Sequence, residues 1–276
     1  MKSIAAYFFD AYHYLNEGKW FKKAIAWFVV YKCLYWILNF RILFATENVI
    51  YHNSVQLPLW KNAVFFLFNH PTTAWSVFFI TLTLLSALWI LILKRFHGPA
   101  FLILWFTVSN IYNNIFCTMT GGDSLLQLLL FFCIFLSNGE GSENLARADL
   151  KTAFHNFGIK AIQIQICIVY FLNGVAKLQD ADWLNGNAVA DSLALEEFSL
   201  PFMYHANAAF CGFLGYSVMI YQLLFPLLVW IGKIKKWYLL IGVVQHLFIA
   251  LAMGLPSFGL IMIVSYLAFY SPFKKT

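Results

Sequence analysis

At residues 170–186 the chain reads YFLNGVAKLQDADWLNG. An apolar helical pattern leads to Lys177 and then gives way to a short acidic stretch that contains Asp180, Asp182 and Trp183. A lysine at the end of an apolar helix lies at the boundary between lipid and water. The segment therefore predicts a transmembrane helix that presents an amine, followed by carboxylates, at the membrane surface.

The composition places the whole chain in a membrane. Hydrophobic residues make up 62% of the 276 residues and charged residues only 11%, whereas a soluble domain has about a quarter of charged residues. A single soluble core could not bury so much apolar surface. The expected fold class is all-α, a polytopic membrane helix bundle in the lipid bilayer. The net charge of +6 fits basic cytoplasmic loops, so no nucleic-acid partner is predicted.

Apolar segments long enough to cross about 30 Å of hydrocarbon predict eight transmembrane helices. They lie near residues 24–44, 72–93, 99–118, 123–138, 155–178, 208–232, 236–253 and 256–271. The expected organisation is one domain over residues 1–276, with residues 1–20 as an interfacial helix on the cytoplasmic face and no soluble C-terminal domain.

The positive-inside rule orients these helices. With the N-terminus inside, nearly all lysines and arginines of the connections fall on the cytoplasmic side, including Lys19, Lys22 and Lys23 before the first span. Both termini are then cytoplasmic, and Lys177 faces away from the cytoplasm. The outer loop 179–207 is expected to contain an amphipathic or re-entrant helix over residues 188–198.

Polar side chains at membrane depth mark helix contacts, pathways or sites, because exposing them to lipid is costly. Spacings of three, four and seven residues predict one polar face on the fifth span, formed by Gln163, Tyr170, Asn173, Gly174 and Lys177. The amine of Lys177 is either a desolvated base or nucleophile, or a side chain that only extends to the interface. The residues alone leave both interpretations open.

Other polar residues offer further alternatives. Asn113 and Asn114, on the third span, suit either interhelical hydrogen bonds or a ligand pocket. Asp123, at the outer end of that region, suits either orientation of a lysine or capping of the next helix. His246 is either a satisfied core histidine or a site residue.

Two cations lie within the first predicted span. Arg41, near its outer end, suits an acidic partner or an anionic substrate, and Lys32 is expected to extend toward the cytoplasmic interface.

The chain has no GxxxxGK[ST], HExxH or GxSxG motif, and its five cysteines form no CxxC pair. Neither ATP-driven transport nor a metal site is therefore predicted.

Several motifs resemble the HTTM superfamily, which includes the membrane domain of vitamin K-dependent γ-glutamyl carboxylase. They are GVAKL at 174–178 with DWLNG at 182–186, YNN at 112–114, GGD at 121–123, NGEGS at 138–142, and the stretch from Gln245 and His246 to Pro256 and Phe258. The resemblance implies that Lys177 occupies the position of the base that deprotonates reduced vitamin K. It also implies a reduced quinone of the menaquinone or vitamin K type as cofactor.

Two departures separate the chain from the carboxylase. Ile115 stands where the carboxylase has a histidine after its asparagine pair, and the sequence ends at Thr276 without a large soluble region. The length is closer to the SdpB-like branch, whose bacterial members assist maturation of secreted antimicrobial peptides.

The expected function is therefore a maturation enzyme in a bacterial plasma membrane. It would act on a secreted peptide at the extracytoplasmic face, with Lys177 as base and a small accessory protein as a possible partner. The expected substrate or quinone pocket comprises Asn113, Asn114, Asp123, Tyr170, Asn173, Gly174, Asp182, Trp183, His246 and Arg41. The alternative is a non-enzymatic chaperone, transporter or immunity factor for a hydrophobic peptide, in which Lys177 pairs with Asp123 or Asp182.

Overall fold

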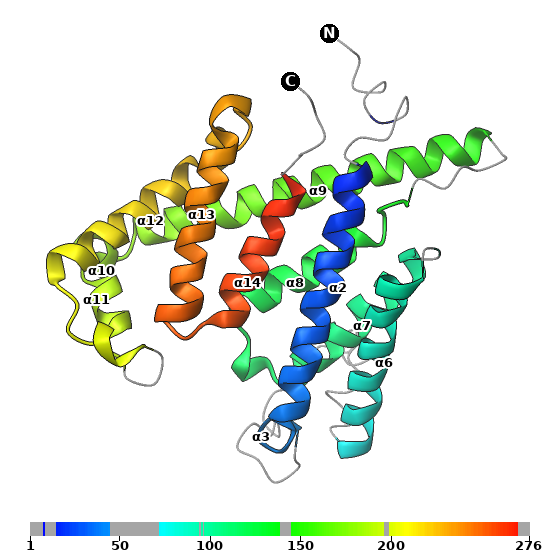
Figure 1. Cartoon of the computed structure of the whole chain (residues 1–276), viewed down its shortest axis with the longest axis horizontal. Coiled ribbons are helices and arrows are strands. Elements are labelled where there is room, and N and C mark those ends of the chain that lie inside the picture. Colours follow the sequence, from blue (N-terminus) through cyan, green and yellow to red (C-terminus); the bar gives the residue numbers. More distant parts are fainter. Residues whose placement is uncertain are drawn as a thin grey trace. The chain divides into compact units, whose positions relative to one another are not determined.

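The computed structural model describes residues 8, 15–44, 72–93, 95, 97–138, 145–195 and 199–269. Helices and the turns between them make up this described part (Figure 1). The chain divides into two compact units, Met1–Ile159 and Lys160–Thr276. A single long helix, α9, carries the chain from the first unit into the second. The organisation as one domain stays a prediction.

The first unit is built around α2. Its helices are α2 (Leu15–Leu38), α3 (Phe40–Phe44), α6 (Thr73–Ile92), α7 (His97–Asn114), η1 (Phe116–Thr118), α8 (Gly121–Cys133) and the start of α9 (Leu145–Lys177). α2 lies beside α6, and α7 packs against both α6 and α8 (Figure 1). On α2 the side chains of Phe21, Ile25 and Val29 are fully buried, yet Leu34 and Leu38 point outward. A helix that is apolar on both faces is typical of a membrane environment.

The second unit consists of helices packed along the end of α9. They are α10 (Ala181–Leu184), α11 (Ala188–Leu193), η2 (Pro201–Met203), α12 (Ala208–Leu228), α13 (Gly232–Ala252), α14 (Pro256–Ser265) and η3 (Tyr266–Ala268). α13 and α14 pack against each other across a turn at Gly254, whose φ of 61° favours glycine. Gly259 of α14 lies directly against the backbone of His246 and Ala250 on α13, so this pair of helices approaches closely.

Each predicted span overlaps a helix in the described part of the chain, although α8 ends at Cys133, before the end of the predicted span 123–138. Four helices are long and apolar enough to cross a membrane, namely Thr73–Ile92, Leu150–Lys177, Ala208–Leu228 and Gly232–Ala252. The helices at Gly121–Cys133 and Pro256–Ala268 are apolar but shorter. The all-helical fold and its membrane character are thus confirmed, and the count of eight spans with both termini inside stays a prediction.

The N-terminal region differs from expectation. Residues 15–20 belong to α2 and not to a separate interfacial helix. This end of α2 packs closely on the His155 ring, since a Cβ added at Gly18 would lie only 3.1 Å from that ring. Of residues 1–14 only Phe8 lies within the described residues. The predicted first span also breaks at Asn39, whose amide donates to the Tyr35 carbonyl oxygen at 2.9 Å.

The outer loop 179–207 contains a shorter helix than predicted. α11 ends at Leu193, and residues 196–198 lie outside the described part. Its amphipathic character is confirmed, because Val189 and Leu193 are buried against Cys211 of α12 while Asp191 is exposed. A re-entrant path through the membrane stays a prediction.

The close approach of α13 and α14 makes Gly259 sensitive to substitution. In Gly259→Ala the new Cβ would lie 2.7 Å from the Cβ of Ala250 and would overlap the His246 carbonyl. We expect the free energy of unfolding to fall by about 1–3 kcal/mol, seen as a lower melting midpoint in detergent micelles. Gly232→Ala is the matched control, because nothing lies within 4 Å of its Cβ position. Equal melting midpoints for the two variants would contradict the prediction.

Candidate functional site

Lys177 is the last residue of α9, and its amine lies over an indole ring. The Nζ atom is 4.5 Å from the ring centroid of Trp183 on α10, a distance typical of a cation–π contact. α10 begins directly after α9, because Oδ1 of Asp180 accepts a hydrogen bond from the Asp182 amide at 2.9 Å. Trp183 in turn packs against the cluster of Val189, Leu193 and Cys211. The indole is therefore held in place beside the amine.

The carboxylates that follow Lys177 do not pair with it. Asp180 and Asp182 are both exposed, while Lys177 is half-buried. In the described part of the chain Lys177 forms no ion pair, and Asp123 is paired with a different lysine, Lys32. The structural pairing considered for Lys177 with Asp123 or Asp182 is thus not found.

The polar face of α9 is narrower than predicted. Gln163, Tyr170 and Gly174 are buried in the second unit, but Asn173 is exposed. Its Nδ2 donates to the Val169 carbonyl oxygen of its own helix at 2.7 Å. Asn173 precedes Gly174 by one residue and so points about 100° away from it around the helix. Asn173 therefore lies at the exposed edge of this face, and its place in a pocket stays a prediction.

Gly174 serves close packing between helices. A Cβ at this position would lie 3.0 Å from the Leu223 side chain and 3.1 Å from the Leu223 backbone nitrogen on α12. Such contacts require a residue without a side chain. The structure gives Gly174 this packing role, and its place in a pocket stays a prediction.

Tyr170 lies at the centre of a buried network of hydroxyl groups and one histidine. Its hydroxyl forms a hydrogen bond of 2.6 Å with Nε2 of His246 and a second, short one with the hydroxyl of Tyr266. Tyr221 extends the network, with 3.2 Å between its hydroxyl oxygen and that of Tyr266. The Tyr170 ring also stacks on Phe225 at a centroid distance of 4.1 Å. Four helical segments are joined at this point, from α9, α12, α13 and η3.

This network was only partly accessible from the sequence. Tyr170 and His246 were predicted site residues, and the structure brings them together. Tyr221 and Tyr266 were missed because they resemble the many other aromatic residues of the spans. The Nδ1 atom of His246 is buried and has no hydrogen-bond partner among the described residues. Buried ring nitrogens are normally satisfied, so this atom is the one polar group of the network left available to a further partner.

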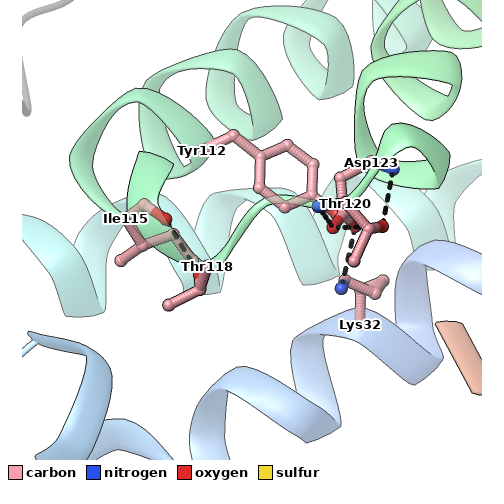
Figure 2. A network of polar contacts seen from close by, with 6 residues as sticks. All are labelled: Lys32, Tyr112, Ile115, Thr118, Thr120 and Asp123. Carbon is pink, nitrogen blue, oxygen red and sulfur yellow. Dashed lines mark hydrogen bonds and ion pairs between the residues drawn. The ribbon is translucent and has the colours of Figure 1, made fainter. Parts of the chain in front are cut away.

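The first unit contains a buried ion pair that the sequence did not predict (Figure 2). Nζ of Lys32 on α2 lies 3.0 Å from Oδ1 of Asp123, and the two side chains are only 5% and 3% exposed. The Tyr112 hydroxyl donates to the same oxygen at 2.6 Å. Lys32 does not extend to the interface as expected, because a buried carboxylate satisfies its charge.

Asp123 combines the two roles that the sequence left as alternatives. Its Oδ2 accepts hydrogen bonds from the backbone nitrogen and the hydroxyl of Thr120, each at 2.9 Å. The Asp123 backbone N–H donates in turn to the Thr120 hydroxyl oxygen at 3.4 Å, which completes a capping box at the start of α8. The carboxylate therefore caps α8 and neutralises Lys32 at the same time. Nearby, the Thr118 hydroxyl donates to the carbonyl oxygen of the buried Ile115 (Figure 2).

A second lysine of α2 binds the other end of α8. Lys22 is fully buried, and its Nζ donates to the carbonyl oxygens of Leu136 and Ser137 at 3.0 and 3.1 Å. It also donates to the side-chain oxygen of Asn138. Carbonyl groups at a helix C-terminus favour a cation. The sequence placed Lys22 on the cytoplasmic side and gave no sign of this buried role.

The remaining predicted site residues lie elsewhere in the first unit. Asn113 is half-buried, and its Nδ2 donates to the Ser109 carbonyl oxygen of its own helix at 2.7 Å. Asn114 is buried, whereas Arg41 on α3 is exposed. Among the residues that the structure describes, no group of His, Cys, Asp and Glu could hold a metal ion.

The second unit and the end of the first match a known family. A model of the HTTM domain matches residues 141–273. This part of the chain is therefore similar to the HTTM domain. The match includes Tyr170, Lys177 and His246, so the resemblance of this region is confirmed. The motifs at residues 112–123 precede the matched region, and their resemblance stays a prediction. Searches of curated proteins and of solved structures each found no match.

The buried ion pair makes a prediction for stability. Lys32→Met and Asp123→Asn each leave one buried polar partner uncompensated, which costs about 3–5 kcal/mol. We expect both variants to melt at clearly lower temperature in detergent, and the double variant to be more stable than the sum of the single effects implies. Lys233→Met, at an exposed lysine, is the control. Additive effects of the two substitutions would show that the pair is not coupled.

Proposed function

We propose that this protein is a membrane-embedded enzyme that matures a secreted peptide at the extracytoplasmic face, with Lys177 as general base. One observation supports this role most directly. The Lys177 amine is half-buried on the Trp183 ring and forms no ion pair in the described part of the chain, although the exposed Asp180 lies near it. A carboxylate in contact would hold an amine in its charged form, which cannot accept a proton.

The surroundings of Lys177 suit a positioned base. α10 fixes Trp183 next to the amine, and the contacts of Trp183 with α11 and α12 restrict the ring. The exposed Asp180 and Asp182 lie just beyond, where a peptide with basic groups could bind. In this proposal Trp183 orients the amine, Lys177 takes a proton from the reacting group, and the outer loop receives the peptide.

We include a reduced quinone as the co-reactant of the proposed enzyme. When bound, such a group supplies electrons to the reaction. His246 fits one of its oxygens, because the buried Nδ1 atom lacks a hydrogen-bond partner and the opposite ring nitrogen is held by Tyr170 at 2.6 Å. Tyr170 lies two turns, about 10 Å, before Lys177 on α9. His246 would therefore hold the group, and Tyr170 would orient the imidazole.

Substitution of Lys177 tests the proposal. Lys177→Met removes the base, and we expect the mature peptide to fall by about 10²–10⁴-fold in mass spectra of the secreted peptides. Lys177→Arg keeps the positive charge and the contact with Trp183 but cannot lose its proton, so we expect the same loss. Lys233→Met, at an exposed lysine of α13, should leave production unchanged.

The pattern of results separates enzymatic from non-enzymatic roles. An enzyme variant loses product while folded protein still accumulates in the membrane. Full activity of Lys177→Arg would mean that only the charge matters, as in a chaperone, transporter or immunity factor. Loss of folded protein in Lys177→Met, with normal behaviour of Lys177→Arg, would assign Lys177 a structural role.

A further inference from the structure

A cavity of about 480 Å³ lies in the first unit, remote in sequence from Lys177. The start of α2, the end of α6 and the start of α7 meet around it. Lys19, Trp20 and Lys23 line it from α2, and Leu93 and His97 line it from the other side. The first residues of α2 and α7 thus lie at the same level as the last residues of α6, as expected for successive helices that cross a membrane in opposite directions. The positive-inside rule places this level at the cytoplasmic surface.

The polar part of the lining is cationic. Lys19 and Lys23 are four residues apart and so lie on one face of α2. Nζ of Lys23 lies 5.9 Å from the Trp20 ring centroid. No carboxylate is among the described residues that line the cavity, and the nearby Glu17 of α2 is only 8% exposed. A ligand with negative charge would therefore meet two lysines without competition from an acidic lining group.

The other part of the lining is apolar and open to the outer surface. Leu91, Ile92 and Leu93 line the cavity at the end of α6, and the last two are 71% and 52% exposed. Trp20 is 61% exposed beside them, and tryptophan is enriched at the level of lipid headgroups. The cavity thus combines a cationic half with an apolar half that continues onto the surface expected to face lipid.

We propose that this cavity binds the phosphate headgroup of an anionic phospholipid. Lys19 and Lys23 hold the phosphate, and Leu91 to Leu93 contact the first part of an acyl chain. A free phosphate ion would use the lysines but not the apolar wall. Basic pockets at the cytoplasmic level between membrane helices are suited to such headgroups. The proposal concerns a different part of the chain from Lys177 and does not depend on the proposed function.

A second cavity gives the headgroup additional space. It has a volume of about 320 Å³ and shares His97 and Asn138 with the first. Lys151 of α9 lines it and adds a third cation. The two adjoining cavities therefore accept a headgroup larger than a single phosphate.

Native mass spectrometry of the full chain in a nonionic detergent tests the proposal. Phosphatidylglycerol and phosphatidylcholine are added separately at equal concentration. We expect phosphatidylglycerol to be retained at least about tenfold more than phosphatidylcholine, and Lys19→Gln with Lys23→Gln to remove this preference. Lys19→Arg with Lys23→Arg should keep it, because the charges remain. High salt should weaken retention.

A second pair of lysines provides a matched control. Lys233→Gln with Lys236→Gln also removes two exposed charges, and Nζ of Lys236 likewise lies 5.9 Å from the Trp237 ring centroid. Neither residue lines either cavity, so the preference should persist.

Three outcomes would overturn the proposal. Equal retention of the two lipids would show that no anion is recognised, and equal losses in the two double variants would reduce the effect to overall charge. Displacement of the lipid by millimolar inorganic phosphate would identify a site for free phosphate instead. Circular dichroism checks that each variant folds. If the double variant does not fold, the single variants Lys19→Gln and Lys23→Gln replace it, each with an expected several-fold loss of the preference for phosphatidylglycerol.

Discussion

Two buried lysines on one helix hold the first unit together. Lys32 meets the carboxylate at the start of α8, and Lys22 meets the carbonyl groups just beyond its end. α8 is short for a membrane helix, and its unsatisfied backbone groups at both ends would be costly in an apolar environment. Thr120 and Asp123 cap the start of α8, Lys32 neutralises that carboxylate, and Lys22 satisfies carbonyl oxygens just beyond the end of the helix. The position of α8, and the turn that carries Thr120, depend on this arrangement.

The second unit uses neutral groups for the same purpose. Tyrosine hydroxyls and His246 connect four segments without any net charge, and glycines at positions 174 and 259 bring the backbones close. Interhelical hydrogen bonds and small residues are the usual means of helix association in lipid. Buried charged side chains therefore connect helices of the first unit, whereas hydroxyl groups and close packing connect those of the second.

Much of the helical framework was predictable, because the length of each apolar segment is set by the membrane thickness. The sites were predictable only where they are local. Lys177 and Trp183 are six residues apart, so their contact follows from one helix end and the next short helix. The partner of Lys32 comes from a helix far along the chain, and a hydropathy pattern does not encode such pairing. Helical spacing likewise does not show which residues at the edge of a face are exposed, as Asn173 is.

The pairing of α2 with α8 has a consequence for biogenesis. Lys22 leaves the ribosome 114 residues before the Leu136 carbonyl that it binds. During that interval α2 has two ammonium groups without their final partners, while α6 and α7 are made. The buried contacts of α2 with α8 and the residues after it therefore form only once this later part of the chain has been synthesised.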